Sequence, residues 1–119
     1  MWPLRLSPKQ QQGRDGEQRA LGFLQAQGLR LVESNFRCTG GEIYLIMRDG
    51  DTLVFVEVRE RASASHGGAA ASITRSKQRR IVCAAHTWLQ RCPRLPPCRI
   101  DVVAIDAGQL AWLQDAIQV

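Results

Sequence analysis

The sequence has no apolar run that approaches the ~20 residues needed to cross a membrane as a helix. Residues 1–12 lack the apolar core of a secretory signal peptide, so we expect a cytoplasmic protein. The chain also lacks the polar excess of a disordered protein, because 45% of its 119 positions are hydrophobic. Its length fits one domain over 14–119, after a mobile N-terminal tail over 1–13 that has no helical periodicity.

The four cysteines include no pair with CxxC spacing, and the two histidines fall in no zinc-binding pattern. Cys83 and His86, three residues apart on a predicted helix, are the best available start for a metal site. Reduced thiols in a cytosolic protein are the better interpretation of these cysteines. We expect no small-molecule cofactor.

No acidic residue occurs between Arg61 and Ile100, a stretch that holds eight basic residues, whereas acids outnumber bases in the rest of the chain. A positive segment on a mildly acidic chain indicates a surface that binds a polyanion. A solvated basic helix explains the charge equally well. If the segment binds nucleic acid, the expected contacts are Arg61, Arg75, Lys77, Arg79 and Arg80.

Hydrophobic periodicity predicts one helix over 14–27 and a second from residue 72 or 74 to about 91. Strands are predicted over four longer segments and a short last one: 29–38, 41–48, 52–61, 98–106 and 109–113. The Ala-, Ser- and Gly-rich segment 61–72 is expected to be a flexible loop. The order α-β-β-β-α-β-(β) predicts an α/β fold, with a mixed sheet flanked by helices.

Asp49-Gly50 is a strong hairpin signal between the second and third strands, and as a turn it places Tyr44 opposite Phe55. Glu57 interrupts an apolar run, and a buried carboxylate costs several kcal/mol unless it is paired or bound to a cation. A plain salt bridge to Arg59, on the same face, is one interpretation. The opposite face of this hairpin is wholly apolar and is predicted to be core: Ile43, Leu45, Met47, Val54, Val56 and Val58.

Two charged residues stand at the heads of the predicted buried helix faces. Glu17 lies one turn before Ala20, and Lys77 lies one turn before Ile81. An acid at a helix start also suits the helix dipole, and a lysine at a core edge can extend its amine to solvent. Structural roles therefore remain open for both.

Several short motifs follow one another along the chain: Gly16-Glu17, Asn35, Gly41-Glu42-Ile43, Phe55-Val56-Glu57-Val58-Arg59, the Gly- and Ala-rich 67–72, Lys77 and Arg99-Ile100-Asp101-Val102-Val103. Over roughly 13–117 the chain thereby resembles the YraN family, which is similar in turn to PD-(D/E)xK nucleases and archaeal Holliday-junction resolvases. The resemblance implies a restriction-endonuclease-like fold and a nucleic-acid partner, with DNA expected.

In such nucleases, acids on the second and third strands hold Mg²⁺, a lysine orients or activates water, and a Glu on a helix assists. The metal and the cations stabilise the negative charge of the phosphodiester transition state. The resemblance implies catalytic roles for Glu17, Glu57, Arg59 and Lys77. It leaves Glu57 and Glu42 as candidate metal ligands.

Tyr44 departs from the family pattern Gly-Glu-Ile-Asp-Leu-Ile, because it stands where the metal-binding aspartate is expected. A neutral phenol is a poor ligand for a hard cation. We therefore expect a nucleic-acid-binding protein of endonuclease-like fold with an impaired catalytic centre and no cofactor.

Two alternatives stay open. One is an active Mg²⁺-dependent endonuclease on DNA, including branched DNA, that acts through Glu17, Glu42 and Glu57. Arg59 would there bind phosphate or orient groups rather than act as a base, because arginine does not deprotonate. The other is a non-catalytic protein-interaction module on the same scaffold.

Overall fold

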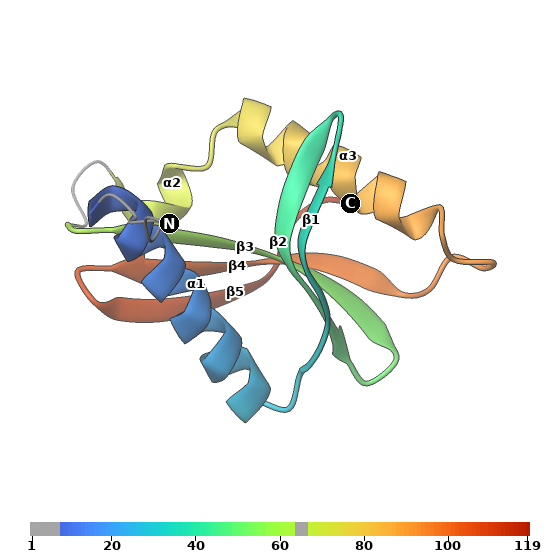
Figure 1. Cartoon of the computed structure of the whole chain (residues 1–119), viewed down its shortest axis with the longest axis horizontal. Coiled ribbons are helices and arrows are strands. Elements are labelled where there is room, and N and C mark those ends of the chain that lie inside the picture. Colours follow the sequence, from blue (N-terminus) through green and yellow to red (C-terminus); the bar gives the residue numbers. More distant parts are fainter. Residues whose placement is uncertain (1–7, 64–66) are drawn as a thin grey trace, which may run out of the picture.

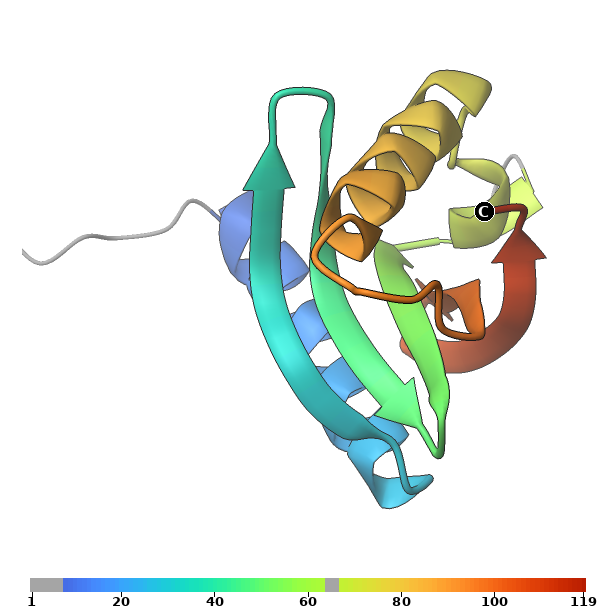
Figure 2. The same ribbon diagram turned by 90° about the vertical axis from the view of Figure 1, so that its right-hand side faces the viewer.

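The computed structural model describes residues 8–63 and 67–119, which form a five-stranded sheet with helices on both faces (Figures 1 and 2). The strands lie in the sheet in chain order, with β3 and β4 parallel and the other neighbours antiparallel. The elements are α1 (Pro8–Ala26), β1 (Arg30–Cys38), β2 (Gly41–Asp49), β3 (Thr52–Arg61), α2 (Gly68–Ala71), α3 (Arg75–Leu89), β4 (Cys98–Asp106) and β5 (Gln109–Ile117). This mixed sheet confirms the predicted α/β class and is consistent with a nuclease-like fold.

Several element boundaries differ from the sequence prediction. Strand β5 runs to Ile117 rather than ending at Leu113, and α3 ends at Leu89 rather than near Arg91. Helix α1 begins at Pro8, where a missing N–H costs nothing in the first turn, so 8–13 belong to the helix. The rest of the predicted tail, 1–7, lies outside the described residues. The predicted loop over 61–72 contains the short helix α2, and 64–66 lie outside the described residues. No described helix is long and apolar enough to span a membrane.

Each face of the sheet carries its own core. On one face, Ala20 and Leu24 of α1 pack on four of the residues predicted to be core: Leu45, Met47, Val54 and Val56. On the other face, Phe55 meets Trp88 of α3 edge-on, with ring centroids 6.0 Å apart. Helix α3 starts at a Thr74 cap whose hydroxyl accepts the Lys77 N–H at 3.2 Å, which confirms the predicted start.

The predicted turn of the β2–β3 hairpin is wrong by one residue. Asp49 pairs with Thr52, so Gly50 and Asp51 form the turn, and Gly50 has the positive φ that such turns require. The register consequently moves by two residues, and Ile46 rather than Tyr44 lies opposite Phe55. Because a shift of two preserves alternation, the predicted faces hold for most of the hairpin.

The pairing of β2 with β3 ends at Leu45–Val56. Beyond that pair, β2 continues along β1, β3 continues along β4, and the two strands separate in space (Figure 1). We call this region the fork. Side chains of β2 no longer alternate regularly between the two faces in the fork. Ile43 belongs to the core under α3. Tyr44 packs against the core under α1, and not against Phe55 as the predicted register implied.

Asp101 is fully buried on β4, and its carboxylate is well satisfied. It accepts hydrogen bonds from Arg99 Nε at 3.0 Å, Trp112 Nε1 at 2.9 Å and the Asp115 N–H at 2.8 Å. Arg99 Nη2 also reaches Asp49 Oδ2 at 3.0 Å. The motif around Asp101 therefore ties β4 to β5 and to the β2–β3 hairpin.

Val56→Asp should unfold the protein, because it places an unpaired charge at a position with no solvent exposure. The cost of several kcal/mol is comparable with the ~5–15 kcal/mol stability of a small domain. Circular dichroism melts check this, with Val32→Asp as the control, since Val32 is 43% exposed. A Val56→Asp protein that melts like the parent would contradict the core assignment.

Candidate functional site

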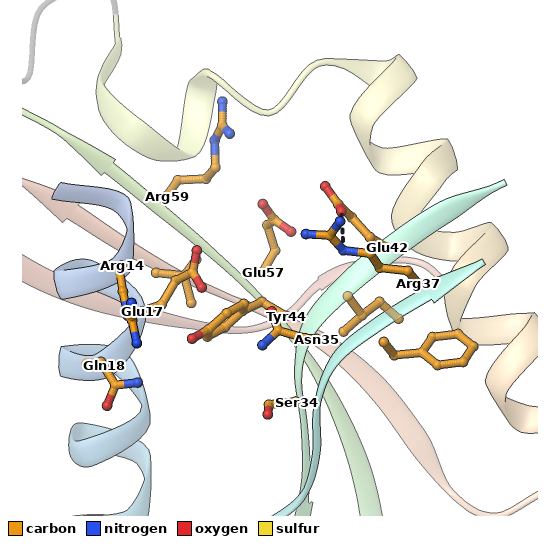
Figure 3. Close-up of a pocket in the computed structure, with 13 residues that line it drawn as sticks. Arg14, Glu17, Gln18, Ser34, Asn35, Arg37, Glu42, Tyr44, Glu57 and Arg59 are labelled. Carbon is orange, nitrogen blue, oxygen red and sulfur yellow. Dashed lines mark ion pairs between the residues drawn. The ribbon is translucent and has the colours of Figure 1, made fainter. Parts of the chain in front are cut away.

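A cavity of about 650 Å³ opens at the fork, between α1 and the β1–β2 hairpin (Figure 3). Polar side chains from α1 and three strands dominate its lining: Arg14, Glu17, Gln18, Ser34, Asn35, Arg37, Glu42, Tyr44, Glu57 and Arg59. The pocket thus brings together Glu17, Glu42, Glu57 and Arg59, which the sequence predicted as site residues.

Glu17 reaches the pocket because Gly16 lets α1 approach β3. A Cβ atom built on Gly16 would lie 2.6 Å from Glu60 Oε1, closer than real side chains pack. A larger residue at position 16 would therefore displace the Glu60 side chain, which packs against the helix here.

Glu57 lies at the centre of the fork (Figure 3). Burial raises the pKa of its carboxyl to about 7, the Arg59 charge opposes this rise, and the Glu42 charge adds to it. Lys77 lowers this pKa and Glu17 raises it by weaker effects. Near neutral pH, Glu57 is accordingly close to half protonated.

Tyr44 is hydrogen-bonded to two residues of α1. Its hydroxyl donates to the Glu17 carboxylate and accepts from the Gln18 amide. Burial raises the pKa of Glu17, the hydrogen bond from Tyr44 opposes the rise, and the Glu42 charge adds to it. Burial and the bond to Glu17 raise the pKa of Tyr44, so the phenol stays neutral and gives Glu17 a hydrogen-bond donor.

Arg59 is anchored away from Glu57. Its Nε donates to Ser72 Oγ at 3.3 Å, and Ser72 in turn donates to the Ala69 carbonyl at 2.6 Å. The guanidinium therefore points toward the α2–α3 connection (Figure 3). The ion pairs among the described residues do not include Glu57 with Arg59, so the salt bridge considered from sequence is not formed.

Lys77 is exposed in the first turn of α3, and its predicted place on the buried stripe is wrong. The buried stripe of this helix begins one turn later, at Ile81. Glu42 is also exposed and lies 3.6 Å from Arg37 Nε in an ion pair open to water. Exposed ion pairs of this kind contribute little to stability, so the pair with Arg37 does not hold the Glu42 side chain in one position.

The residues of the pocket do not fit the magnesium site that the resemblance implies. Within 8–63 and 67–119, no group of three His, Cys, Asp or Glu side chains is placed to hold a metal ion. Glu42 and Glu57 line one pocket without completing such a group, and the nearby Tyr44 offers only a neutral phenol. Cys83 and His86 are both exposed and belong to no such group either.

Asn35, which the sequence analysis named only as one of the motifs of the family resemblance, is a pocket residue. Its φ of 57° lies in the left-handed region, which Asn tolerates better than most residues. Strand β1 continues through this residue, and the Asn35 side chain lies beside Tyr44 in the pocket (Figure 3). Hydrophobic periodicity carries no signal for such a backbone angle. Arg14, Gln18 and Arg37 were missed because each looks like an ordinary surface residue.

The predicted nucleic-acid contacts Arg75, Arg79 and Arg80 are all exposed on α3, and Arg61 is exposed at the end of β3. Arg75 and Arg79 line a second cavity of about 650 Å³ beside the end of β5. The charge of Lys77 instead acts on Glu57. The basic residues consequently spread around α3 rather than forming one patch.

Comparison with known proteins places the chain among close relatives. Residues 16–105 match the model of "Uncharacterised protein family UPF0102". A UPF0102 protein of Herminiimonas arsenicoxydans is 61% identical over 106 residues, 89% of this chain and 86% of that protein. One of Janthinobacterium is 56% identical over 110 residues, 92% and 89% of the two chains. One of Cupriavidus metallidurans is 61% identical over 106 residues, 88% and 79%.

Glu57→Gln should change how stability depends on pH. A folded-state pKa of about 7, raised from 4.5, gives stability that is fully present below pH 4.5 and is lost as pH rises to about 7. Between pH 5 and pH 8 the parent should lose roughly 2–3 kcal/mol relative to the variant, which cannot ionise.

Thermal melts at pH 5, 6, 7 and 8 measure this difference. Asp51→Asn removes an exposed carboxylate in the hairpin turn and should follow the parent at every pH. A constant difference between Glu57→Gln and the parent across this range would show that Glu57 is not held in a raised-pKa environment.

Proposed function

Because the chain belongs to the UPF0102 family, we propose that it is a nucleic-acid-binding protein of nuclease-like fold with an impaired metal-dependent centre. The position of Tyr44 beside Glu17 in the fork pocket carries this proposal. It puts a proton donor against Glu17, at the position where the resemblance expects a metal-binding aspartate. Since that donor already satisfies Glu17, the pocket has less need of a cation.

The distribution of positive charge supports nucleic acid as the partner. Three arginines, Arg14, Arg37 and Arg59, line the fork pocket from α1, β1 and β3. Helix α3 adds exposed arginines, and no acidic residue lies in the sequence around them to neutralise their charge. Guanidinium groups bind phosphate oxygens in a bidentate manner, so these positions suit a phosphate backbone. DNA is the partner that the family resemblance implies.

Replacing Arg75, Arg79 and Arg80 together by Gln should weaken DNA binding and flatten its salt dependence. Each lost phosphate contact lowers the slope of log K against log salt by about 0.9 on duplex DNA. Fluorescence anisotropy at several salt concentrations measures both quantities.

A triple Gln variant of the exposed Arg30, Arg48 and Arg94 removes the same charge elsewhere and serves as the matched control. Equal losses in the two triple variants would mean that only net charge matters. Absence of salt-dependent binding by the parent would favour the protein-interaction module instead.

An active Mg²⁺-dependent endonuclease is the second candidate, and it would require Glu17, Glu42 and Glu57 to move together around a cation, because they form no metal-binding group as they lie among the described residues. Glu42 and Glu17 each raise the pKa of Glu57, so their negative charges are close enough to repel one another. A divalent cation would relieve that repulsion. Tyr44 is the residue whose replacement distinguishes this candidate from the first.

Tyr44→Asp should make the protein depend on a divalent cation. The change replaces a donor to Glu17 by a second carboxylate, so the variant should be less stable than the parent in chelator. It should gain several degrees in melting temperature with Mg²⁺ or Mn²⁺, because bound metal stabilises only the folded state.

Melts with metal and with chelator check this for three proteins. Tyr44→Asn is the control, since it removes the phenol without adding a charge. The parent and the control should respond to metal weakly or not at all. An equal metal response in all three would show that position 44 does not contribute to a cation site.

A further inference from the structure

The fork pocket holds a set of groups that suits phosphodiester chemistry without a metal ion. Glu17 offers a carboxylate, Tyr44 a neutral hydroxyl bonded to it, and Arg14 and Arg59 two cations. We propose that this pocket cleaves single-stranded RNA by transesterification, with Glu17 as the general base toward the 2′-hydroxyl. The proposal rests on the nucleic-acid binding proposed above and adds the substrate class and reaction.

The groups in the fork pocket suit cleavage of RNA better than cleavage of DNA. Attack by water on a phosphodiester needs a strongly activated nucleophile, which nucleases commonly obtain from a metal-bound water. In RNA the 2′-hydroxyl is already next to the phosphorus, and this proximity replaces much of that activation. A base and nearby cations then suffice. A flexible single strand can bring the 2′-oxygen into line with the leaving oxygen, whereas a regular duplex holds it out of line.

Glu17 is oriented for the role of base. Glu17 lines the pocket from α1, one residue after the position at which the helix packs against the Glu60 side chain of β3. The Tyr44 hydroxyl donates to this carboxylate and is itself held by the Gln18 amide. A carboxylate that accepts one hydrogen bond keeps further lone pairs to receive a proton. Tyr44 is therefore a positioning residue for Glu17.

The two arginines put positive charge on two sides of the pocket. Arg14 lines the pocket from α1 and Arg59 from β3, and the Arg59 guanidinium is turned toward the α2–α3 connection (Figure 3). Arg59 Nε donates to Ser72 Oγ, and this anchor holds the guanidinium at the α2 side of the pocket, where a phosphate of a bound strand would meet it. Guanidinium groups stay cationic at every relevant pH and hold phosphate oxygens in pairs. Such fixed cations stabilise the extra negative charge of a five-coordinate phosphorus.

The proposed step balances without an oxidant or reductant. The 2′-oxygen attacks the adjacent phosphorus while its proton passes to the Glu17 carboxylate. The bond from phosphorus to the 5′-oxygen breaks, and that oxygen takes a proton from water. Glu17 then returns its proton to the solvent. The products are a strand ending in a 2′,3′-cyclic phosphate and a strand beginning with a 5′-hydroxyl.

The test incubates the full chain, in chelator, with an end-labelled single-stranded RNA, the DNA of the same sequence and a fully 2′-O-methylated RNA. Only the unmodified RNA should be cut, with 2′,3′-cyclic phosphate ends. Glu17→Gln should lower the rate roughly 100-fold or more while RNA binding, measured by anisotropy, stays unchanged. Asp51→Asn, purified identically, should cut like the parent.

Tyr44→Phe provides a second variant that keeps the packed ring. It should lower kcat with little change in KM, because the hydroxyl orients Glu17 rather than holding RNA. Cutting of the DNA or methylated strand overturns the proposal, and so does a Glu17→Gln protein as active as the parent. RNA that binds but stays intact also overturns it and leaves the proposed function standing. Loss of all nucleic-acid binding would remove the proposed function itself.

Discussion

The separation of β2 from β3 after the Leu45–Val56 pair is the constraint on which the rest of the site depends. Each strand keeps its other neighbour beyond that pair, so β2 stays bonded to β1 and β3 to β4. At the fork, each of the two strands therefore still has hydrogen-bonded backbone groups along one edge. The fork interrupts the apolar core that β2 and β3 share, and polar residues from α1, β1, β2 and β3 line the opening.

The electrostatics of the fork explain how carboxylates persist there. Burial penalises the charge on Glu57, and neighbouring acids add repulsion. Partial protonation of Glu57, the nearby charge of Arg59 and the hydroxyl of Tyr44 on Glu17 each offset part of this cost. Partial protonation and the nearby arginine charges therefore allow these carboxyl groups to lie in one pocket. An aspartate at position 44 would remove one of these offsets and add a charge.

Other residues of the motifs connect the strands and α2 to one another and lie outside the fork pocket. Asp101 and Arg99 join β4 to β5 and to the β2–β3 turn through hydrogen bonds of 2.8–3.0 Å. Ser72 and the Asp106 carboxylate hold α2 against the sheet, the latter through the Ala69 N–H at 2.7 Å. Ser72 also receives Arg59, so these connections reach the edge of the pocket.

The sequence by itself determined the order of the long helices and strands, a start at 72 or 74 for the second long helix, the apolar face of the β2–β3 hairpin and the exception that Glu57 makes in an apolar run. These features follow from local periodicity and from the cost of placing a charge in an apolar run, both of which are visible in a linear chain. Only the tertiary structure decided the hairpin register, the exposure of Lys77 and the partner of Arg59. It alone turned Tyr44 toward Glu17 and gave Asn35 its left-handed backbone conformation. These depend on where two strands stop pairing and on what a distant helix presents there, and neither leaves a local pattern in the sequence.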